Sequence, residues 1–287
     1  MRLRSLLFVP GDSERKFAKA AACGADALIL DLEDSVAPGN KAAARAHVAG
    51  LPGAGTPRDW SFFVRINALD TGLAEADMEA VVKPGLDGLV IPKADGAADI
   101  ARIGHALDAL EAKAGIAPGT VRLVVVATET PRAIFNLGSY APAHPRLAGL
   151  TWGAEDLGAA IGVAANKEPD GRWTFPFQVA RGLCLFAAAA AEVAPIDTLY
   201  ADFKDTEGLE RDCRLSRRDG FVGRLAIHPD QVAAINRGYA PGAEELAWAR
   251  KIVEAFAANP GAGTLGIDGK MYDIPHLKAA RKILASA

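Results

Sequence analysis

Residues 124–132 read VVVATETPR, and residues 147–157 read LAGLTWGAEDL. Each stretch starts as an apolar run typical of a buried strand, then carries a carboxylate, Glu129 in the first and Asp156 in the second, and passes directly into helix-forming residues. If both strands belong to one parallel sheet, these carboxylates emerge at the same edge, where α/β proteins bind their ligands. Two hard oxygen ligands at one edge indicate a Mg²⁺ site.

The same unit of strand and helix recurs through the chain. Apolar runs that predict strands lie at residues 3–10, 25–32, 61–67, 88–93, 122–128, 147–152, 198–202 and 224–228. Eight strands separated by helical stretches, in a length near the roughly 250 residues typical of the fold, predict an α/β protein built as a (β/α)₈ TIM barrel. A doubly wound sheet is the alternative, but its first strand-to-helix turn would carry GxGxxG, and this chain has PGDSER there.

Two segments are additional to the eight strand–helix units of a minimal barrel. Residues 162–177, rich in Gly, Asn and Pro, are predicted to form a long βα loop at the active-site face. We expect the barrel to span residues 1–258 and a C-terminal extension to span residues 259–287. The extension is predicted to hold a hairpin around residues 267–272 and a final helix from Pro275, and it either caps the barrel or reaches a neighbouring subunit.

Composition narrows the class of function. The 287 residues are 50% hydrophobic and carry a formal net charge of −3, with both signs interspersed, which indicates no nucleic-acid partner and no membrane-binding patch. No apolar run approaches the roughly 20 residues of a membrane span. The three cysteines are widely spaced, as in structural thiols of a reducing compartment, so we expect a cytoplasmic protein that acts on small molecules.

Charged residues at two further strand ends are candidates for the site. Arg65 ends an apolar run, where burying an unpaired guanidinium would be costly, so it is predicted to bind a substrate carboxylate in a bidentate manner. Asp31, Glu33 and Asp34 end the preceding run and are predicted either to position metal-bound waters or to hold Arg65.

Simpler roles are open for several of these residues. Glu129 precedes Thr130-Pro131 and Asp156 precedes LGAAIG, so each carboxylate alone would equally suit the N-terminus of a helix, and Glu155 competes with Asp156. Their equivalent placement at two strand ends favours the metal pair. The five histidines are scattered and predict no zinc site; His228, at the eighth strand end, suits either catalysis or a turn.

Phe8, Arg15 and Lys19 place one aromatic ring and two cations on the first strand and helix. This combination suits a nucleotide or phosphate. A solvent-facing helix surface explains the two cations equally well.

Several motifs in chain order carry a resemblance. They are RSLLFVPGDSERKFAKA, GADALILDLEDSVAP, FVRIN, GLVIPKAD, ATETPRAI, LTWGAEDLGAAIG, RLAIHPDQV and GIDGKMYDIPHLKAAR. The chain resembles the citrate lyase beta-subunit family of acyl-CoA lyases, whose relatives include malyl-CoA and citramalyl-CoA lyases. The resemblance implies a TIM barrel and Mg²⁺-dependent retro-Claisen cleavage of a 3-hydroxyacyl-CoA into acetyl-CoA and a 2-oxoacid, with CoA as part of the substrate.

The resemblance also implies roles for single residues. Glu129 and Asp156 match the metal ligands and Arg65 the carboxylate-binding arginine, the three residues that the strand ends indicate. Asp273, in GKMYD, matches a catalytic aspartate delivered across a subunit interface, which implies a homo-oligomer, with a trimer as one form. The implied contacts with CoA come from Phe8, Arg15, Lys19 and the backbone at Ala226 and Ile227.

Two departures from the family pattern bear on the substrate. Position 8 is Phe where some relatives have Tyr, and Arg15 replaces a lysine. The sequence leaves the choice among malyl, citramalyl, citryl and methylmalyl thioesters open. It also leaves three alternatives to the lyase: a malyl-CoA thioesterase, a citryl-lyase subunit that acts on an acyl-carrier protein within a complex, and a non-enzymatic CoA-metabolite sensor.

Overall fold

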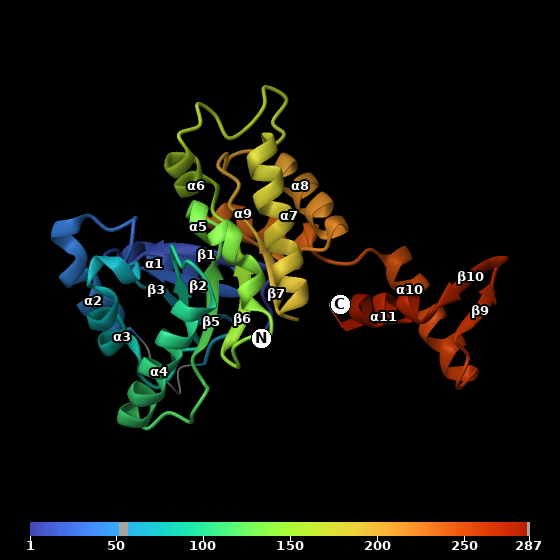
Figure 1. Cartoon of the computed structure of the whole chain (residues 1–287), viewed down its shortest axis with the longest axis horizontal. Helices are drawn as coiled ribbons and strands as arrows, with labels where there is room; N and C mark the ends of the chain where they lie inside the picture. The colour runs from blue at the N-terminus through green and yellow to red at the C-terminus, as the bar shows by residue number, and fades with distance from the viewer. Residues whose placement is uncertain (52–56, 286–287) are drawn as a thin grey trace. The chain divides into compact units, whose positions relative to one another are not determined.

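The computed structural model describes residues 1–51 and 57–285. Within these residues, eight parallel strands close into a barrel in chain order, with β8 paired to β1 (Figure 1). The predicted (β/α)₈ TIM barrel is therefore confirmed. The strands are β1 (Ser5–Pro10), β2 (Ala27–Asp31), β3 (Ser61–Arg65), β4 (Gly88–Ile91), β5 (Arg122–Val126), β6 (Leu147–Thr151), β7 (Ala194–Asp197) and β8 (Gly223–Ala226).

Helices follow the strands and pack around the barrel (Figure 1). They are α1 (Glu14–Ala21), α2 (Lys41–Ala49), α3 (Ala74–Val81), α4 (Ala97–Ala114), α5 (Pro131–Asn136), α6 (Ala154–Ile161), α7 (Phe175–Ala190), α8 (Thr206–Asp219) and α9 (Pro229–Gly238). Short 3₁₀ turns lie at η1 (Pro38–Asn40), η2 (Leu69–Thr71) and η3 (Leu137–Tyr140). Local sequence sets the helix starts: the Thr130 hydroxyl accepts the Ala133 N–H at 3.0 Å, and Pro131 opens α5.

The barrel interior is filled by apolar side chains that alternate strands contribute. Every residue of β2 and of β4 is buried, which explains why both strands appear in the sequence as continuous apolar runs. The packed interior includes Leu6, Ile29, Phe63, Val90, Val124 and Ile196. Because this core closes the barrel, polar chemistry is confined to its ends.

Two expectations about the barrel are wrong. The seventh strand is Ala194–Asp197, ahead of the predicted residues 198–202, because pairing with β6 and β8 makes a strand of APID despite its Pro and Asp. Residues 162–174 do not follow a strand directly: they connect α6 to α7, so the segment is an inter-helix loop.

The C-terminal region forms a compact unit of its own. The chain divides into Met1–Gly238 and Tyr239–Ala287, earlier than the boundary expected after residue 258. The second unit contains α10 (Ala243–Ala258), β9 (Thr264–Ile267), β10 (Lys270–Asp273) and α11 (Ile274–Ala285), which confirms the hairpin and the final helix. The boundary moves because α10 packs its apolar face on α11, through Ile252, Phe256, Leu277 and Ala280.

The described part of the chain contains no helix with the length and hydrophobicity that a membrane span requires.

A buried ion cluster holds β6, β7 and β8 together on the outside of the barrel. Asp197 is 1% exposed and accepts hydrogen bonds from Trp152 at 2.6 Å, from Arg181 at 3.1 Å and from Arg224 at 3.0 Å. Burial by itself would raise the pKa of this carboxyl, but the guanidiniums of Arg224 and Arg181 lower it to about 2. The charge of Asp197 is therefore part of the folded structure.

We expect Asp197→Asn to lower the free energy of unfolding by about 3–5 kcal/mol near neutral pH, because it removes the buried charge that pairs with the guanidiniums of both Arg181 and Arg224. The folded-state pKa of Asp197 lies below the unfolded value, so wild-type stability should also fall as the pH drops from about 4 towards 2. Denaturant titrations at neutral and acid pH measure both effects.

Asp219→Asn is the matched control, since Asp219 pairs with the same Arg181 at the surface and should contribute at most about 1 kcal/mol. An Asp197→Asn variant with the stability and pH dependence of the wild type would contradict the assignment.

Candidate active site

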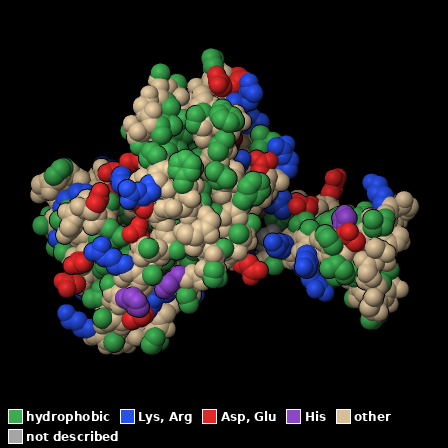
Figure 2. All heavy atoms as spheres, viewed as in Figure 1, with side chains coloured by type: hydrophobic (Ala, Val, Ile, Leu, Met, Phe, Trp, Pro, Cys, Tyr) green, Lys and Arg blue, Asp and Glu red, His purple; other side chains and the backbone are tan. Residues whose placement is uncertain are grey.

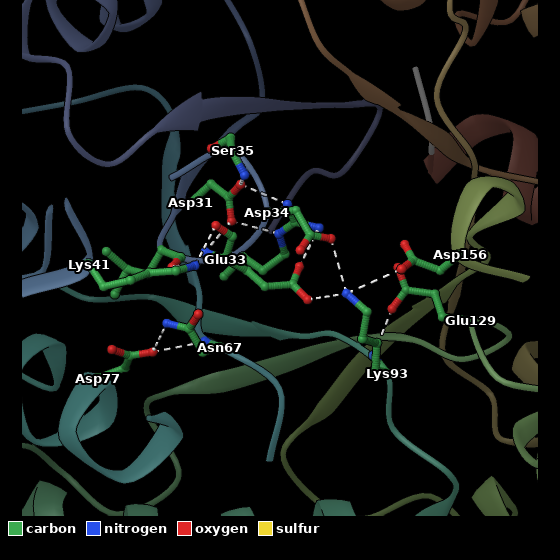
Figure 3. Close-up of polar contacts among 12 residues, drawn as sticks. Asp31, Glu33, Asp34, Ser35, Lys41, Asn67, Asp77, Lys93, Glu129 and Asp156 are labelled. Atoms are coloured by element: carbon green, nitrogen blue, oxygen red, sulfur yellow. Dashed lines mark hydrogen bonds and ion pairs between the residues drawn. The ribbon is translucent and has the colours of Figure 1, made fainter. Parts of the chain in front are cut away.

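Five charged residues gather where consecutive strands end at one mouth of the barrel. Asp31 and Arg65 are the last residues of β2 and β3 and lie opposite each other in the parallel ladder. Lys93 follows β4, Glu129 follows β5, and Asp156 lies in the first turn of α6, after β6. Figure 3 shows four of these side chains, those of Asp31, Lys93, Glu129 and Asp156, reaching into one region from neighbouring elements. The sequence expectation that carboxylates from separate strands meet at one edge agrees with this geometry.

Arg65 is held by the acidic cluster of β2. Its Nε and Nη2 atoms each donate to one oxygen of Asp31 at 2.7 Å, and its Nη1 atom lies 2.9 Å from Glu33 Oε2. Asp31 is fixed in turn by the N–H groups of Glu33 at 2.9 Å and Ser35 at 3.0 Å. Of the two roles predicted for Asp31 and Glu33, the structure supports the one that holds Arg65. A guanidinium has five N–H donors, so Arg65 retains donors for an incoming carboxylate.

Lys93 links this cluster to the two predicted metal ligands. Its ammonium contacts Glu33, Asp34 at 3.0 Å and Asp156 at 3.3 Å. Its backbone N–H donates to Glu129 Oε2 at 2.6 Å. Lys93 is not among the residues predicted from the sequence, although it shares the signal of Arg65, a cation at the end of an apolar run.

Glu129 is buried, with 5% of its surface exposed. The pKa of its carboxyl is raised to about 8, chiefly by burial and in part by the negative charge of Asp156, while the hydrogen bond from the Lys93 N–H opposes the rise. Space for this side chain depends on Gly153, where an added Cβ would lie 2.6 Å from Cγ of Glu129. Glu129 is not the cap of α5, since Thr130 fills that position.

Glu129 and Asp156 fit a divalent cation by the chemistry of their donors. Two carboxylates of like charge lie near each other in a partly buried site, where a cation would offset their repulsion. Within the described part of the chain, no group of three or more His, Cys, Asp or Glu side chains is arranged to hold a metal. An ion on this pair would need oxygens from water or substrate, which is the way Mg²⁺ usually binds. Glu155, the competitor of Asp156, is exposed and accepts a hydrogen bond from Asn166 at 3.1 Å.

Residues 4–229 match the family model for HpcH/HpaI aldolase/citrate lyase, and residues 178–287 match the model for the C–C bond lyase of the TIM-barrel fold. The chain belongs to the HpcH/HpaI aldolase/citrate lyase family. It is therefore a carbon–carbon lyase by family, as the sequence resemblance implies.

Two relatives and one solved structure are similar to this chain over nearly its whole length. The (3S)-malyl-CoA thioesterase of Cereibacter sphaeroides is 36% identical over 286 residues, which cover 99% of this chain and 94% of the relative. The citrate lyase subunit beta of Escherichia coli is also 36% identical, over 99% of this chain and 93% of the subunit. The crystal structure of CitE from Mycobacterium tuberculosis in complex with magnesium, acetoacetate and coenzyme A has a TM-score of 0.80 at 34% identity, covering 100% of this chain and 98% of that one.

The residues that the family resemblance assigns to CoA lie in different surroundings. The Phe8 ring lies 4.7 Å from the guanidinium of Arg65, so it supports that side chain. Arg15 and Lys19 are exposed on α1, and within the described residues neither forms an ion pair. Ala226 is buried in β8, and the Ile227 N–H already donates to Gln231 Oε1 at 2.8 Å.

His228 lies in the turn that starts α9. Its ring stacks on Phe203, with the ring centroids 4.8 Å apart, and its Nδ1 accepts the N–H of Asp230 at 3.2 Å. These contacts support the turn role left open by the sequence.

Asp273 belongs to the C-terminal unit, at the end of β10. Its Oδ1 lies 2.5 Å from His276 Nδ1, and it accepts the His276 N–H at 3.4 Å at the start of α11. The hydrogen bond from His276 lowers the pKa of Asp273, so the group is a carboxylate at neutral pH.

Gly153→Ala should weaken binding of divalent cations about 10- to 100-fold, because the added Cβ displaces Glu129. The variant should still fold, since alanine readily adopts the backbone angles of residue 153. Calorimetric titration of the purified protein with Mg²⁺ measures the loss. Gly138→Ala is the control, since a Cβ there meets nothing within 4 Å. Equal Mg²⁺ affinity in the two variants would refute the role of Gly153.

Proposed function

We propose that this protein is a Mg²⁺-dependent lyase that cleaves a 3-hydroxyacyl-CoA, of the malyl-CoA or citramalyl-CoA type, into acetyl-CoA and a 2-oxoacid. The observation that carries the proposal is the carboxylate pair of Glu129 and Asp156 at the barrel mouth, where Glu129 lies close enough to the held guanidinium of Arg65 for their charges to interact. Membership of the citrate lyase family and the magnesium and coenzyme A in the CitE structure support it.

Different residues of the chain bind different parts of the substrate. Arg65 binds the substrate carboxylate with its remaining N–H donors, while Asp31 and Glu33 keep its plane fixed. Mg²⁺ held by Glu129 and Asp156 supplies a Lewis acid that stabilises negative charge on the reacting hydroxyl oxygen. Arg15 and Lys19, exposed and free of ion pairs among the described residues, are our candidates for contacts with the CoA phosphates.

We assign the proton transfer to Asp273. As a carboxylate, it can accept the proton of the substrate hydroxyl, the C–C bond then breaks to give the 2-oxoacid and the enolate of acetyl-CoA, and the same proton returns to the enolate carbon. The reaction then needs no external acid. We propose that Asp273 acts in the site of a neighbouring subunit of a homo-oligomer, with a trimer as the expected form.

Exposed apolar side chains support an oligomer. Phe135 on α5 is 89% exposed, and Phe175 and Phe186 on α7 are 75% and 69% exposed. Hydrophobic side chains gather over these helices in Figure 2. Contiguous apolar surface of this kind is typical of protein interfaces.

The free thiols of Cys23, Cys184 and Cys213 support our proposal of a cytoplasmic location.

Thioester hydrolysis is the second candidate function, because the (3S)-malyl-CoA thioesterase is 36% identical over 99% of this chain. Hydrolysis would place water at the thioester and release free CoA with an intact hydroxy acid. A lyase releases a 2-oxoacid and keeps the thioester in acetyl-CoA.

The test is to incubate the protein with Mg²⁺ and a panel of malyl, citramalyl, citryl and methylmalyl thioesters, and to measure 2-oxoacid and free thiol separately. We expect 2-oxoacid without equivalent thiol. Thiol without 2-oxoacid would favour the thioesterase, and no reaction with any substrate would refute both.

Asp156→Ala should reduce turnover to background, because it removes one of the two metal carboxylates. Glu155→Ala is the matched control in the same turn of α6, and it should retain activity since Glu155 is exposed and bonded to Asn166. Rates with the best substrate of the panel at several Mg²⁺ concentrations measure the effect. Full activity of Asp156→Ala with unchanged Mg²⁺ dependence would contradict the metal assignment.

Asp273→Asn should lower kcat by about 10²- to 10⁴-fold while the protein stays folded, because asparagine caps a helix as well as aspartate but cannot accept the proton. Asp268→Asn, in the hairpin turn at φ 50°, is the control and should keep wild-type rates. Steady-state kinetics and circular dichroism together check the pair. Wild-type kcat in Asp273→Asn would remove this residue from the mechanism.

A further inference from the structure

We propose that Lys93 is a positioning residue that occupies one oxygen of each metal carboxylate, so that Glu129 and Asp156 each offer a single oxygen and the site prefers Mg²⁺ to Ca²⁺. This inference rests on the proposed function, which assigns the metal to these two residues. It adds a role for Lys93, whose position between the two groups of carboxylates is visible in Figure 3.

The backbone of Lys93 is in an uncommon conformation. Its φ angle is 51°, in the left-handed region that residues other than glycine seldom adopt. Conformations of this kind are energetically unfavourable and cluster at functional sites. Here the residue follows β4 and directs its N–H at Glu129 Oε2, at 2.6 Å. The strained residue therefore makes the hydrogen bond that orients the buried carboxylate.

The side chain of Lys93 reaches the second carboxylate. Its Nζ atom lies 3.3 Å from Asp156 Oδ1. On the other side it contacts Glu33 and lies 3.0 Å from Asp34 Oδ2. Glu33 is itself paired with Arg65 at 2.9 Å. The contacts with Glu33 and Asp34 therefore keep the ammonium in place next to Asp156.

One oxygen remains open on each carboxylate. Among the described residues, Glu129 Oε1 and Asp156 Oδ2 have no hydrogen-bond or ion-pair partner. Mg²⁺ requires compact octahedral geometry and binds one or two carboxylates with several waters, whereas Ca²⁺ accepts six to eight oxygens and often takes both oxygens of a carboxylate. Blocking the second oxygen of each ligand therefore favours Mg²⁺.

A simple charge role for Lys93 makes a different prediction. If the ammonium only offset the surrounding carboxylates, its loss would strengthen the binding of every divalent cation by the same factor. If it blocks Asp156 Oδ1, its loss frees a second oxygen that Ca²⁺ uses better than Mg²⁺. The ratio of the two affinities separates these roles.

The test is calorimetric titration of the full chain with Mg²⁺ alone and with Ca²⁺ alone. Lys93→Met removes the ammonium at similar length. Lys93→Gly removes it and suits the positive φ angle, so that a folding defect of one variant leaves the other to be measured. We expect either variant to raise the affinity for Ca²⁺ relative to Mg²⁺ by about tenfold or more.

Lys41→Met is the matched control. The Lys41 ammonium also lies beside the acidic cluster, but it donates to the carbonyl oxygens of Leu32 at 2.8 Å and Glu33 at 2.7 Å and contacts neither metal ligand. The ratio of the Ca²⁺ affinity to the Mg²⁺ affinity in Lys41→Met should equal that of the wild type. An unchanged ratio in both Lys93 variants, with Mg²⁺ bound by the wild type, would overturn this inference alone. A wild-type protein that binds no Mg²⁺ would overturn the proposed function and this inference with it.

Discussion

Closure of the eight parallel strands is the constraint on which the site depends. The ladder sets the ends of β2 to β6 side by side, so residues far apart in the chain, such as Asp31 and Asp156, reach one mouth of the barrel. The apolar interior excludes polar chemistry from the rest of the barrel. Fixed strand ends allow charged side chains to be held at short distances by one another, and each depends on its neighbours for position.

The charges at this mouth form one connected network. Arg65 joins the β2 carboxylates, and Lys93 joins those carboxylates to Glu129 and Asp156. Buried carboxylates require such partners, because desolvation alone disfavours their charge, as the raised pKa of Glu129 illustrates. The proposed cation site at one end of the network and the proposed carboxylate site on Arg65 at the other would suit a hydroxy-acid thioester, which is compatible with the family to which the chain belongs.

The sequence predicts this arrangement where local pattern decides structure. Continuous apolar runs located seven strands, and the residues after those runs included Arg65, Glu129 and Asp156. Strand β7 was misplaced because APID has weak strand propensity and depends on β6 and β8 for its pairing. No local pattern singles out Lys93, because its importance arises from contacts with four residues on three other segments. The role of Asp273 rests on resemblance, since in sequence it is also a helix-capping residue.

A crystal structure of the protein with Mg²⁺ and a 2-oxoacid such as pyruvate would show directly whether Glu129 and Asp156 bind the metal and Arg65 binds the carboxylate. We expect one ion bound through Glu129 Oε1 and Asp156 Oδ2, with the pyruvate carboxylate on Arg65 and with Lys93 still in contact with the other oxygen of each ligand. An ion bound without Glu129 and Asp156, or pyruvate bound away from Arg65, would contradict this assignment.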